Sequence, residues 1–409
     1  MASALFSELA GRFSLEGIDI DNWTFKFYSR VSVGILLVAS AASICATYGG
    51  EPITCKGGES YDQAYCWLHG TSHLPPNKIA SEITNGDHCF NYDAENDSDS
   101  SDDNSKDTKY YIWVSLMLFI NAALFIIPDQ LWKHFEGGMI EQFGSNRREF
   151  LEDTEKHAQT FKDLSKNQTR RYFFTFIFFE FLNLGMCILN FVLIDKFLSG
   201  KFSSYGSKTL QYYTGTLERT AVEYGEKNNK GTIDLMLNPM CSVFPTIVSC
   251  DYTTFAVNGA DDKRSNICIL GQNIMNQQIY LILWFWFIVL FVASGWMVIY
   301  RLVTLSLVDM QRTTIQFYLK SKDVDAVKAL KLDFDHIGNW FVLTQIGRNA
   351  TPYAFRKFLN EVAGKRKKIE GEKEKEKRQK TNVGNELKPS SSTEKLTGND
   401  LELSLMGTS

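Results

Sequence analysis

Cysteine is the residue type whose number and spacing in this sequence support chemistry. The chain of 409 residues contains eight cysteines, and six of them fall in two polar stretches between long apolar runs. Their spacing lacks the paired C-x-x-C geometry of structural zinc sites, and His69 beside them is a lone histidine, so we expect disulfide bonds and no metal. Six cysteines allow about fifteen sets of pairs, and the residues alone select none. The six are Cys55, Cys66, Cys89, Cys241, Cys250 and Cys268.

The apolar runs between these stretches predict four membrane-spanning helices. The mean hydropathy of -0.17 resembles that of a soluble protein, because long polar loops and a charged tail dilute the apolar runs. A bilayer core of about 30 Å needs roughly 20 apolar helical residues. Buried helices of a large soluble domain usually carry a polar stripe, which these runs mostly lack. The predicted spans are residues 31–50, 110–128, 172–194 and 279–300.

A cleaved secretory signal is the competing interpretation of the first run. Ala39, Ser40 and Ala41 resemble a cleavage site. The thirty residues before the run are too many for the short charged region of such a signal. We therefore expect a retained first span.

Basic residues at the ends of the runs predict the orientation. Cytoplasmic flanks carry an excess of Lys and Arg, which places both termini and residues 129–171 in the cytoplasm. Residues 51–109 and 195–278 should then be extracellular. All six loop cysteines lie in these extracellular loops, where disulfides persist. The basic flanks contain Lys26, Arg30, Lys133, Arg170, Arg171 and Arg301, against Lys109 and Lys196 on the other side.

Several motifs resemble those of innexins, the channel proteins of invertebrate gap junctions, over residues 18–364. Two positions depart from the family pattern: Ile112 stands where glutamine is usual, and Gly271 replaces a usual proline. The order, spacing and coverage of the motifs indicate a member of that family. The motifs are DNWTFKFYSRVSVGILL, GEPITC, YCWLHGT, KYYIWV, FEFLNLGMCILNFVLIDKFLSGKFSSYG, VFPTIVSCDY and NICILGQNIMNQQIYLILWFWF.

The resemblance implies an all-α membrane protein with four transmembrane helices, disulfide-linked extracellular loops and a helical cytoplasmic domain. It further implies a plasma-membrane channel subunit at cell junctions. Like subunits, identical or different, would form a ring, with eight as the family's number. That ring would dock with the opposed hemichannel of an adjacent cell and pass ions and small metabolites.

The resemblance also implies which cysteines are bonded. Cys55 corresponds to the partner of Cys268, and Cys66 to the partner of Cys250. Cys89 and Cys241 exceed the family's two cysteines per loop. We predict a third bridge between them.

Glu180 is an acidic residue in the middle of the third run, where insertion of a carboxylate is expensive. We expect it to avoid lipid. One interpretation is a hydrogen-bond partner between helices, with Asn183 one turn away on the same face. The alternative is a pore or gating residue.

The first residues of the chain carry apolar side chains at helical spacing. The residues alone suit a short amphipathic helix on the membrane surface. The resemblance implies instead that this segment folds into the pore mouth and narrows it, and this is our prediction. The candidate funnel residues are Leu5, Glu8, Leu9, Arg12 and Glu16.

Residues 92–109 form an acidic insert with seven acidic residues and two lysines. Without the glycine and terminal glutamate of an EF-hand, it is best interpreted as a disordered segment. Asn96 begins an N-glycosylation acceptor within it. Because a glycan is bulky, it would hinder docking, so an undocked, pannexin-like hemichannel is the alternative function.

The remaining segments are predicted to be cytoplasmic. Residues 1–30 form the pore segment, 129–171 a solvated helical loop, 301–364 a helical domain and 365–409 a disordered tail. In the helical domain, Thr351 and Pro352 predict a helix start, and Gly364 its end. Its apolar face comprises Phe355, Phe358, Leu359 and Val362.

No motif suggests an enzyme, a cofactor or nucleic-acid binding. The six histidines are scattered, and no nucleophile, phosphate loop or metal spacing is present. Membrane lipids are expected partners. The KRKK cluster at the start of the tail could attract anionic lipid, but a solvated run of charges is the safer interpretation. A four-pass adhesion protein is the alternative from another class, since it would share the topology and the extracellular cysteines.

Overall fold

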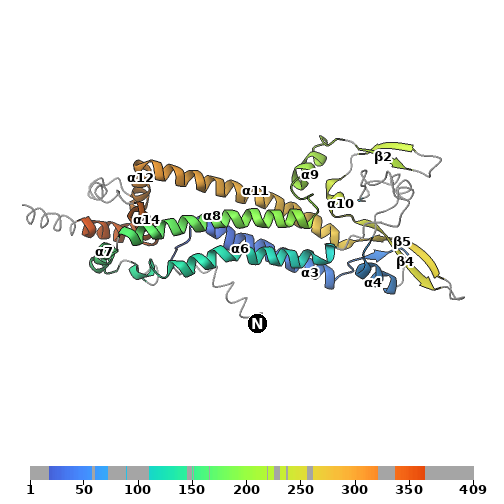
Figure 1. The fold of residues 1–409 in the computed structure, drawn as a ribbon, viewed down its shortest axis with the longest axis horizontal. Coiled ribbons are helices and arrows are strands. Elements are labelled where there is room, and N and C mark those ends of the chain that lie inside the picture. Colours follow the sequence, from blue (N-terminus) through green and yellow to red (C-terminus); the bar gives the residue numbers. More distant parts are fainter. Residues whose placement is uncertain are drawn as a thin grey trace, which may run out of the picture.

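The chain forms an elongated molecule in which long helices run side by side along its length (Figure 1). The computed structural model describes residues 18–57, 60–71, 89, 110–144, 150, 152–164, 166–218, 220–224, 231–235, 238–255, 261–320 and 337–363. A region with strands lies at one end of the long helices, and a group of shorter helices lies at the other.

Four helices are long and apolar enough to cross a membrane. They contain 26, 23, 32 and 36 residues, and at about 1.5 Å per residue each exceeds the roughly 30 Å of a bilayer core. This confirms the predicted four-pass helical fold. The first consists of α2 (Trp23–Lys26), the π-helical η1 (Phe27–Ser32) and α3 (Val33–Tyr48), and the others are α6 (Val114–Glu136), α8 (Lys166–Phe197) and α11 (Gly271–Ser306).

Each long helix extends beyond its predicted span at the dome end, whereas the first ends at Tyr48 and α6 begins at Val114, both inside their predicted spans at the other end. The helix α6 continues through Pro128 to Glu136, and a left-handed Gly137 with φ of 62° ends it. Such a glycine is a common helix stop because it has no Cβ to clash. A helix end need not coincide with a membrane boundary, so the predicted span boundaries stay predictions.

Apolar side chains on these helices face both inward and outward. Tyr28, Leu118 and Phe287 belong to a buried core between the helices. Val38 and Val292 are about 71% and 67% exposed. A large exposed apolar surface is unfavourable in water, but it suits helices that face lipid or neighbouring subunits.

One end of the bundle carries a three-stranded antiparallel sheet in the order β1, β5, β4. We call this whole end of the molecule, with its strands and short helices, the disulfide-linked end. The sequence analysis did not anticipate its strands. The elements at this end are β1 (Thr54–Cys55), α4 (Ser60–His69), η3 (Tyr110–Trp113), α9 (Tyr205–Tyr213), β2 (Thr220–Tyr224), β3 (Gly231–Leu235), α10 (Pro239–Val243), β4 (Ile247–Phe255) and β5 (Asp261–Ile269).

Short helices at the opposite end form what we call the dome. They are η4 (Glu141–Phe143), α7 (Thr154–Asp163), α12 (Val308–Leu319), α14 (Ile337–Asn349) and a helix over residues 352–363. Aromatic rings dominate the buried core that joins the dome to α6 and α8, as Trp132, Phe176 and Phe341 illustrate. The dome therefore packs on the ends of the long helices as one body.

The last dome helix begins as the sequence predicts. The Thr351 hydroxyl accepts a hydrogen bond from the backbone nitrogen of Ala354 at 3.3 Å. The predicted end at Gly364 lies outside the described residues. The predicted apolar face of Phe355, Phe358, Leu359 and Val362 is buried.

Gly338 allows α14 to lie close against α8. A Cβ at this position would lie 2.4 Å from the backbone nitrogen of Arg170 and the carbonyl carbon of Thr169. Next to it, the Thr169 hydroxyl donates to Asn339 Oδ1 at 2.8 Å. The contact between dome and bundle therefore requires glycine here.

We predict that Gly338→Ala destabilises the protein by about 1 to 3 kcal/mol, the usual cost of overpacking. The measurement is thermal unfolding of the purified protein in detergent. Gly34→Ala is the control, because a Cβ at Gly34 meets nothing within 4 Å. Equal midpoints for the two variants would contradict the close approach of α14 to α8.

Candidate functional site

The first two disulfides join the first loop to the β4–β5 hairpin. Cys55 in β1 is bonded to Cys268 in β5, and Cys66 in α4 is bonded to Cys250 in β4. These are the pairs that the resemblance implies. The four cysteines are buried in one small core that also contains Ile53, Val248, Tyr252 and Leu270.

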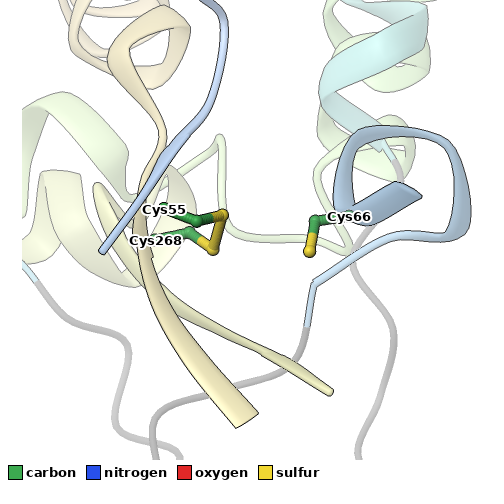
Figure 2. Close-up of side chains that lie close together, drawn as sticks. All are labelled: Cys55, Cys66 and Cys268. Carbon is green, nitrogen blue, oxygen red and sulfur yellow. A yellow bond between two sulfur atoms is a disulfide. The ribbon is translucent and has the colours of Figure 1, made fainter. Parts of the chain in front are cut away.

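Figure 2 shows the Cys55–Cys268 bridge with the sulfur of Cys66 beside it. The Sγ atoms of Cys55, Cys66 and Cys268 are all within 4.8 Å of one another. Metals bind thiolates rather than disulfide sulfurs, so these oxidised cysteines act as covalent ties. The same closeness would let a thiolate freed at Cys66 attack the Cys55–Cys268 bridge.

A third disulfide joins Cys89 to Cys241 in α10. This is the bridge predicted for the two additional cysteines. The Cys89 carbonyl accepts hydrogen bonds from the backbone nitrogens of Thr246 and Ile247, both at 3.1 Å. Gln277 of α11 donates to the Phe244 carbonyl at 2.8 Å and also lies 3.1 Å from Cys89 Sγ. The region of the third bridge thus connects both loops to the first turns of α11.

Glu180 of α8 forms a two-point ion pair with Arg301 of α11. Arg301 Nε lies 2.7 Å from Glu180 Oε2, and Nη2 lies 2.8 Å from Oε1. The Glu180 and Arg301 side chains are only 10% and 12% exposed. The Asn22 amide, which caps α2, donates to Glu180 Oε1 as well. Glu180 therefore connects three of the four long helices.

Aromatic rings enclose the arginine of this ion pair. The guanidinium carbon of Arg301 lies 5.2 Å from the ring centroid of Phe176 and 5.5 Å from that of Phe341. Cations are attracted to the faces of aromatic rings. The ion pair thus extends its contacts from the bundle to α14 in the dome.

Asn183, predicted to lie one turn from Glu180 on the same face of α8, makes no such contact through its amide nitrogen. It is buried, and its Nδ2 has no hydrogen-bond partner among the described residues. Asn183 and Glu180 line the same cavity of about 30 Å³, enough for about one water. Arg301 was the missed partner, although an acidic residue inside a span is itself a signal to seek a cation.

A second charged cluster, which the sequence analysis missed, surrounds Asp21 just before α2. Its buried carboxylate lies 3.9 Å from Arg30 Nη2 and 4.0 Å from Lys133 Nζ. Lys133 also pairs with Asp129 at 2.8 Å. Burial, reinforced by the Asp129 carboxylate, raises the pKa of Asp21 from 3.8 to about 6, although Lys133 opposes the shift.

The dome forms hydrogen bonds with the backbone of Asp19 and Asp21. Arg348 Nη1 in α14 donates to the Asp21 carbonyl at 2.7 Å. Asn349 donates to the Asp19 carbonyl at 2.9 Å and accepts from the Asp19 nitrogen at 2.7 Å. The segment that enters the first long helix is therefore fixed to the dome by three hydrogen bonds.

Two groups of predicted site residues lie outside the described residues. They are the funnel candidates Leu5, Glu8, Leu9, Arg12 and Glu16, and the glycosylation acceptor Asn96.

Four membrane-crossing helices, loops joined by disulfides at one end and a helical dome at the other define a class of four-pass membrane protein. The innexin family model matches residues 21–366. Innexin inx2 of Schistocerca americana is 30% identical over 392 residues, which cover 90% of this chain and 98% of that protein. Innexin inx2 of Drosophila melanogaster is 29% identical, covering 88% and 95%. Innexin inx3 of Drosophila melanogaster is 26% identical, covering 89% of each.

The chain therefore belongs to the innexin family. Innexins are subunits of gap-junction channels rather than enzymes, and they act as oligomers. The protein is accordingly a multi-pass membrane channel subunit of gap junctions.

Removing the Cys66–Cys250 bridge should abolish coupling between paired cells, because the hairpin loses a tie that contributes about 2 to 4 kcal/mol. Cys66→Ser, Cys250→Ser and the double variant are compared by junctional conductance. Cys45→Ser is the control, since Cys45 is a free, exposed cysteine. Cys250→Ser should additionally yield mispaired disulfides, because it frees Cys66 beside the neighbouring bridge. Normal coupling in the double variant would contradict this role.

Breaking the Glu180–Arg301 pair from either side should destabilise the protein by about 3 to 5 kcal/mol, because one buried charge remains uncompensated. Glu180→Gln and Arg301→Gln are each expected to lower surface expression and the unfolding temperature. The double variant Glu180→Gln with Arg301→Gln should lose less than the two single losses combined. Additive losses would show that the two side chains do not interact.

Asp21 should make the protein more stable as the pH falls through 6. Because its folded pKa of about 6 exceeds the unfolded 3.8, the folded state binds the extra proton between these values. Protonation of Asp21 therefore raises the free energy of unfolding on acidification, by up to about 3 kcal/mol. Thermal unfolding of Asp21→Asn above and below pH 6 should lack that gain. The control Asp309→Asn, at an exposed position, should keep the stability gain. Equal pH dependence in the two variants would refute the assignment of that gain to Asp21.

Proposed function

We propose that this innexin assembles with like subunits, identical or different, into an octameric ring in the plasma membrane. The dome and both termini lie in the cytoplasm, and the disulfide-linked end lies outside the cell. There the ring docks with the opposed hemichannel of an adjacent cell and passes ions and small metabolites. For the spans, loops and tail we propose the boundaries that were predicted from the sequence.

The observation that carries this proposal is the position of the disulfides. All three connect the first loop to the second at the end of the bundle opposite the dome (Figure 1). Disulfides persist in oxidising compartments, which supports an extracellular position for this end. The two free cysteines, Cys45 and Cys187, lie within long helices.

The β4–β5 hairpin is the part of this end that we assign to docking. Its register pairs Val248 with Cys268 and continues to Phe255 opposite Asp261. Both bridges to the first loop attach near the base of the hairpin, at Cys250 and Cys268. In Figure 1 the hairpin projects beyond the helices. A two-stranded ribbon is only marginally stable alone, so the bridges at its base keep it rigid enough to meet another subunit.

The dome contacts at Asp19 and Asp21 support the predicted funnel. They fix the point from which the preceding residues leave the bundle. We assign Leu5, Glu8, Leu9, Arg12 and Glu16 to the pore mouth on this basis and on family membership. Glu180, in contrast, is assigned to helix packing rather than to the pore, because Arg301 and Asn22 satisfy its oxygens.

A glycan placed on the hairpin tests docking without disturbing the disulfides. Asp251→Asn creates an N-x-T acceptor at residues 251–253, and Asp251 is exposed. We expect a glycosidase-sensitive mobility shift and normal single-cell currents, but loss of coupling between paired cells. The matched control combines Asp251→Asn with Thr253→Ala, which removes the acceptor and should restore coupling.

Each result of this experiment has a distinct meaning. Absence of the mobility shift would contradict an extracellular hairpin. A glycosylated variant that still couples cells would remove the hairpin from the docking surface. If the unmodified protein gives single-cell currents but no coupling, the undocked hemichannel is favoured. A glycan at Asn96 would then be the first candidate for what hinders docking.

A further inference from the structure

A cavity of about 250 Å³ lies where α2 and α11 meet the dome. Residues of α2, α8, α11, α12 and α14 line it. A water molecule takes up roughly 30 Å³ in the liquid. The cavity is therefore large enough for a ligand group rather than for a single ordered water.

The charge of the lining is positive. Among the described residues that line the cavity, two are arginines, Arg301 and Arg348, and none is acidic. Glu180, the partner of Arg301, lines a separate and smaller cavity. An anion in the larger cavity would meet two guanidinium groups, of which Arg301 is already paired with Glu180 on its other side and Arg348 has no carboxylate partner among the described residues.

Both arginines retain hydrogen-bond donors. Arg301 binds Glu180 through Nε and Nη2, and Arg348 binds the Asp21 carbonyl and Gln345 through Nη1. Within the described part of the chain, Nη1 of Arg301 and both Nε and Nη2 of Arg348 make no hydrogen bond. Guanidinium donors in this planar arrangement suit phosphate oxygens.

Aromatic side chains form much of the remaining wall. Trp340 is fully buried, whereas Trp23 and Trp296 are 41% and 63% exposed. Tryptophan is enriched where membrane meets water. Trp23 begins the first long helix, and Trp296 lies in the dome-side part of α11. The cavity is thus bordered by rings suited to the level of lipid headgroups.

We propose that this cavity binds the phosphate of an acidic phospholipid. The phosphate contacts Arg301 and Arg348, and the acyl chains lie along the exposed apolar face of α11 formed by Val289, Val292 and Trp296. Basic pockets between transmembrane helices bind anionic headgroups in this way. The proposal requires only that the protein is embedded in a membrane, so it stands apart from docking and conduction.

The test uses the purified full-length protein in nanodiscs of phosphatidylcholine, alone or with phosphatidic acid. Phosphatidic acid retained after transfer to detergent is measured by native mass spectrometry. Arg348→Gln should lower retention by about fivefold, as expected for one arginine contact near the membrane surface. Thr344→Trp should lower it equally by filling the cavity while both arginines remain. Arg312→Gln, which removes a partly exposed arginine of α12 that does not line the cavity, should retain lipid normally.

Thr344→Trp keeps the test decisive if Arg348→Gln loosens the contact with Asp21. Normal retention in both cavity variants would overturn the proposal. A third arm adds inorganic phosphate to nanodiscs of phosphatidylcholine alone and follows the unfolding temperature. Stabilisation equal to that given by phosphatidic acid would assign the cavity to a soluble anion and overturn the lipid assignment.

Discussion

The covalent connection between the first and second loops constrains the whole disulfide-linked end of the protein. The three disulfides close stretches of 213, 184 and 152 residues. Hydrophobic burial at this end is modest, with a core of few residues around the cysteines. Each tie contributes about 2 to 4 kcal/mol when taken singly. The bridges also fix the register of β1 and α4 against the hairpin, which packing alone would specify weakly.

At the other end of the bundle, buried charges replace covalent ties. Glu180 holds α8, α11 and the start of the first helix together, and Arg301 extends this contact to the aromatic rings of the dome. Arg348 and Asn349 fix the backbone before α2. Any movement of the dome must therefore pull on the segment that leads to the amino terminus. This arrangement offers a direct mechanical link between the dome and the proposed funnel.

The sequence predicted the four helices because their runs are long and nearly free of charge. The residues alone could not select the disulfide pairs, since these depend on how the two loops pack, as in the pairing of Cys55 in β1 with Cys268 in β5. The resemblance supplied two of the pairs, and the two cysteines left over predicted the third. The strands were within reach of prediction. Ile247, Val248 and Thr253 give the β4 segment the β-branched composition of a strand.

The charged contacts were harder to predict, for a physical reason. Glu180 and Arg301 are 121 residues apart in sequence, and their meeting depends on how α8 lies against α11. Asp21 looks like an ordinary surface residue in the sequence. Its burial arises only because α6 and the dome close over it, with the Arg348 contact spanning 327 residues.

Peptide mapping of surface-expressed protein under non-reducing conditions tests whether all three disulfides join the first loop to the second. Thiols are blocked before digestion, and cross-linked peptides are identified by mass spectrometry. We expect three cross-linked pairs, each joining the first loop to the second: Cys55 with Cys268, Cys66 with Cys250, and Cys89 with Cys241. A bridge within one loop, or blocked free thiols at any of these six positions, would contradict this expectation.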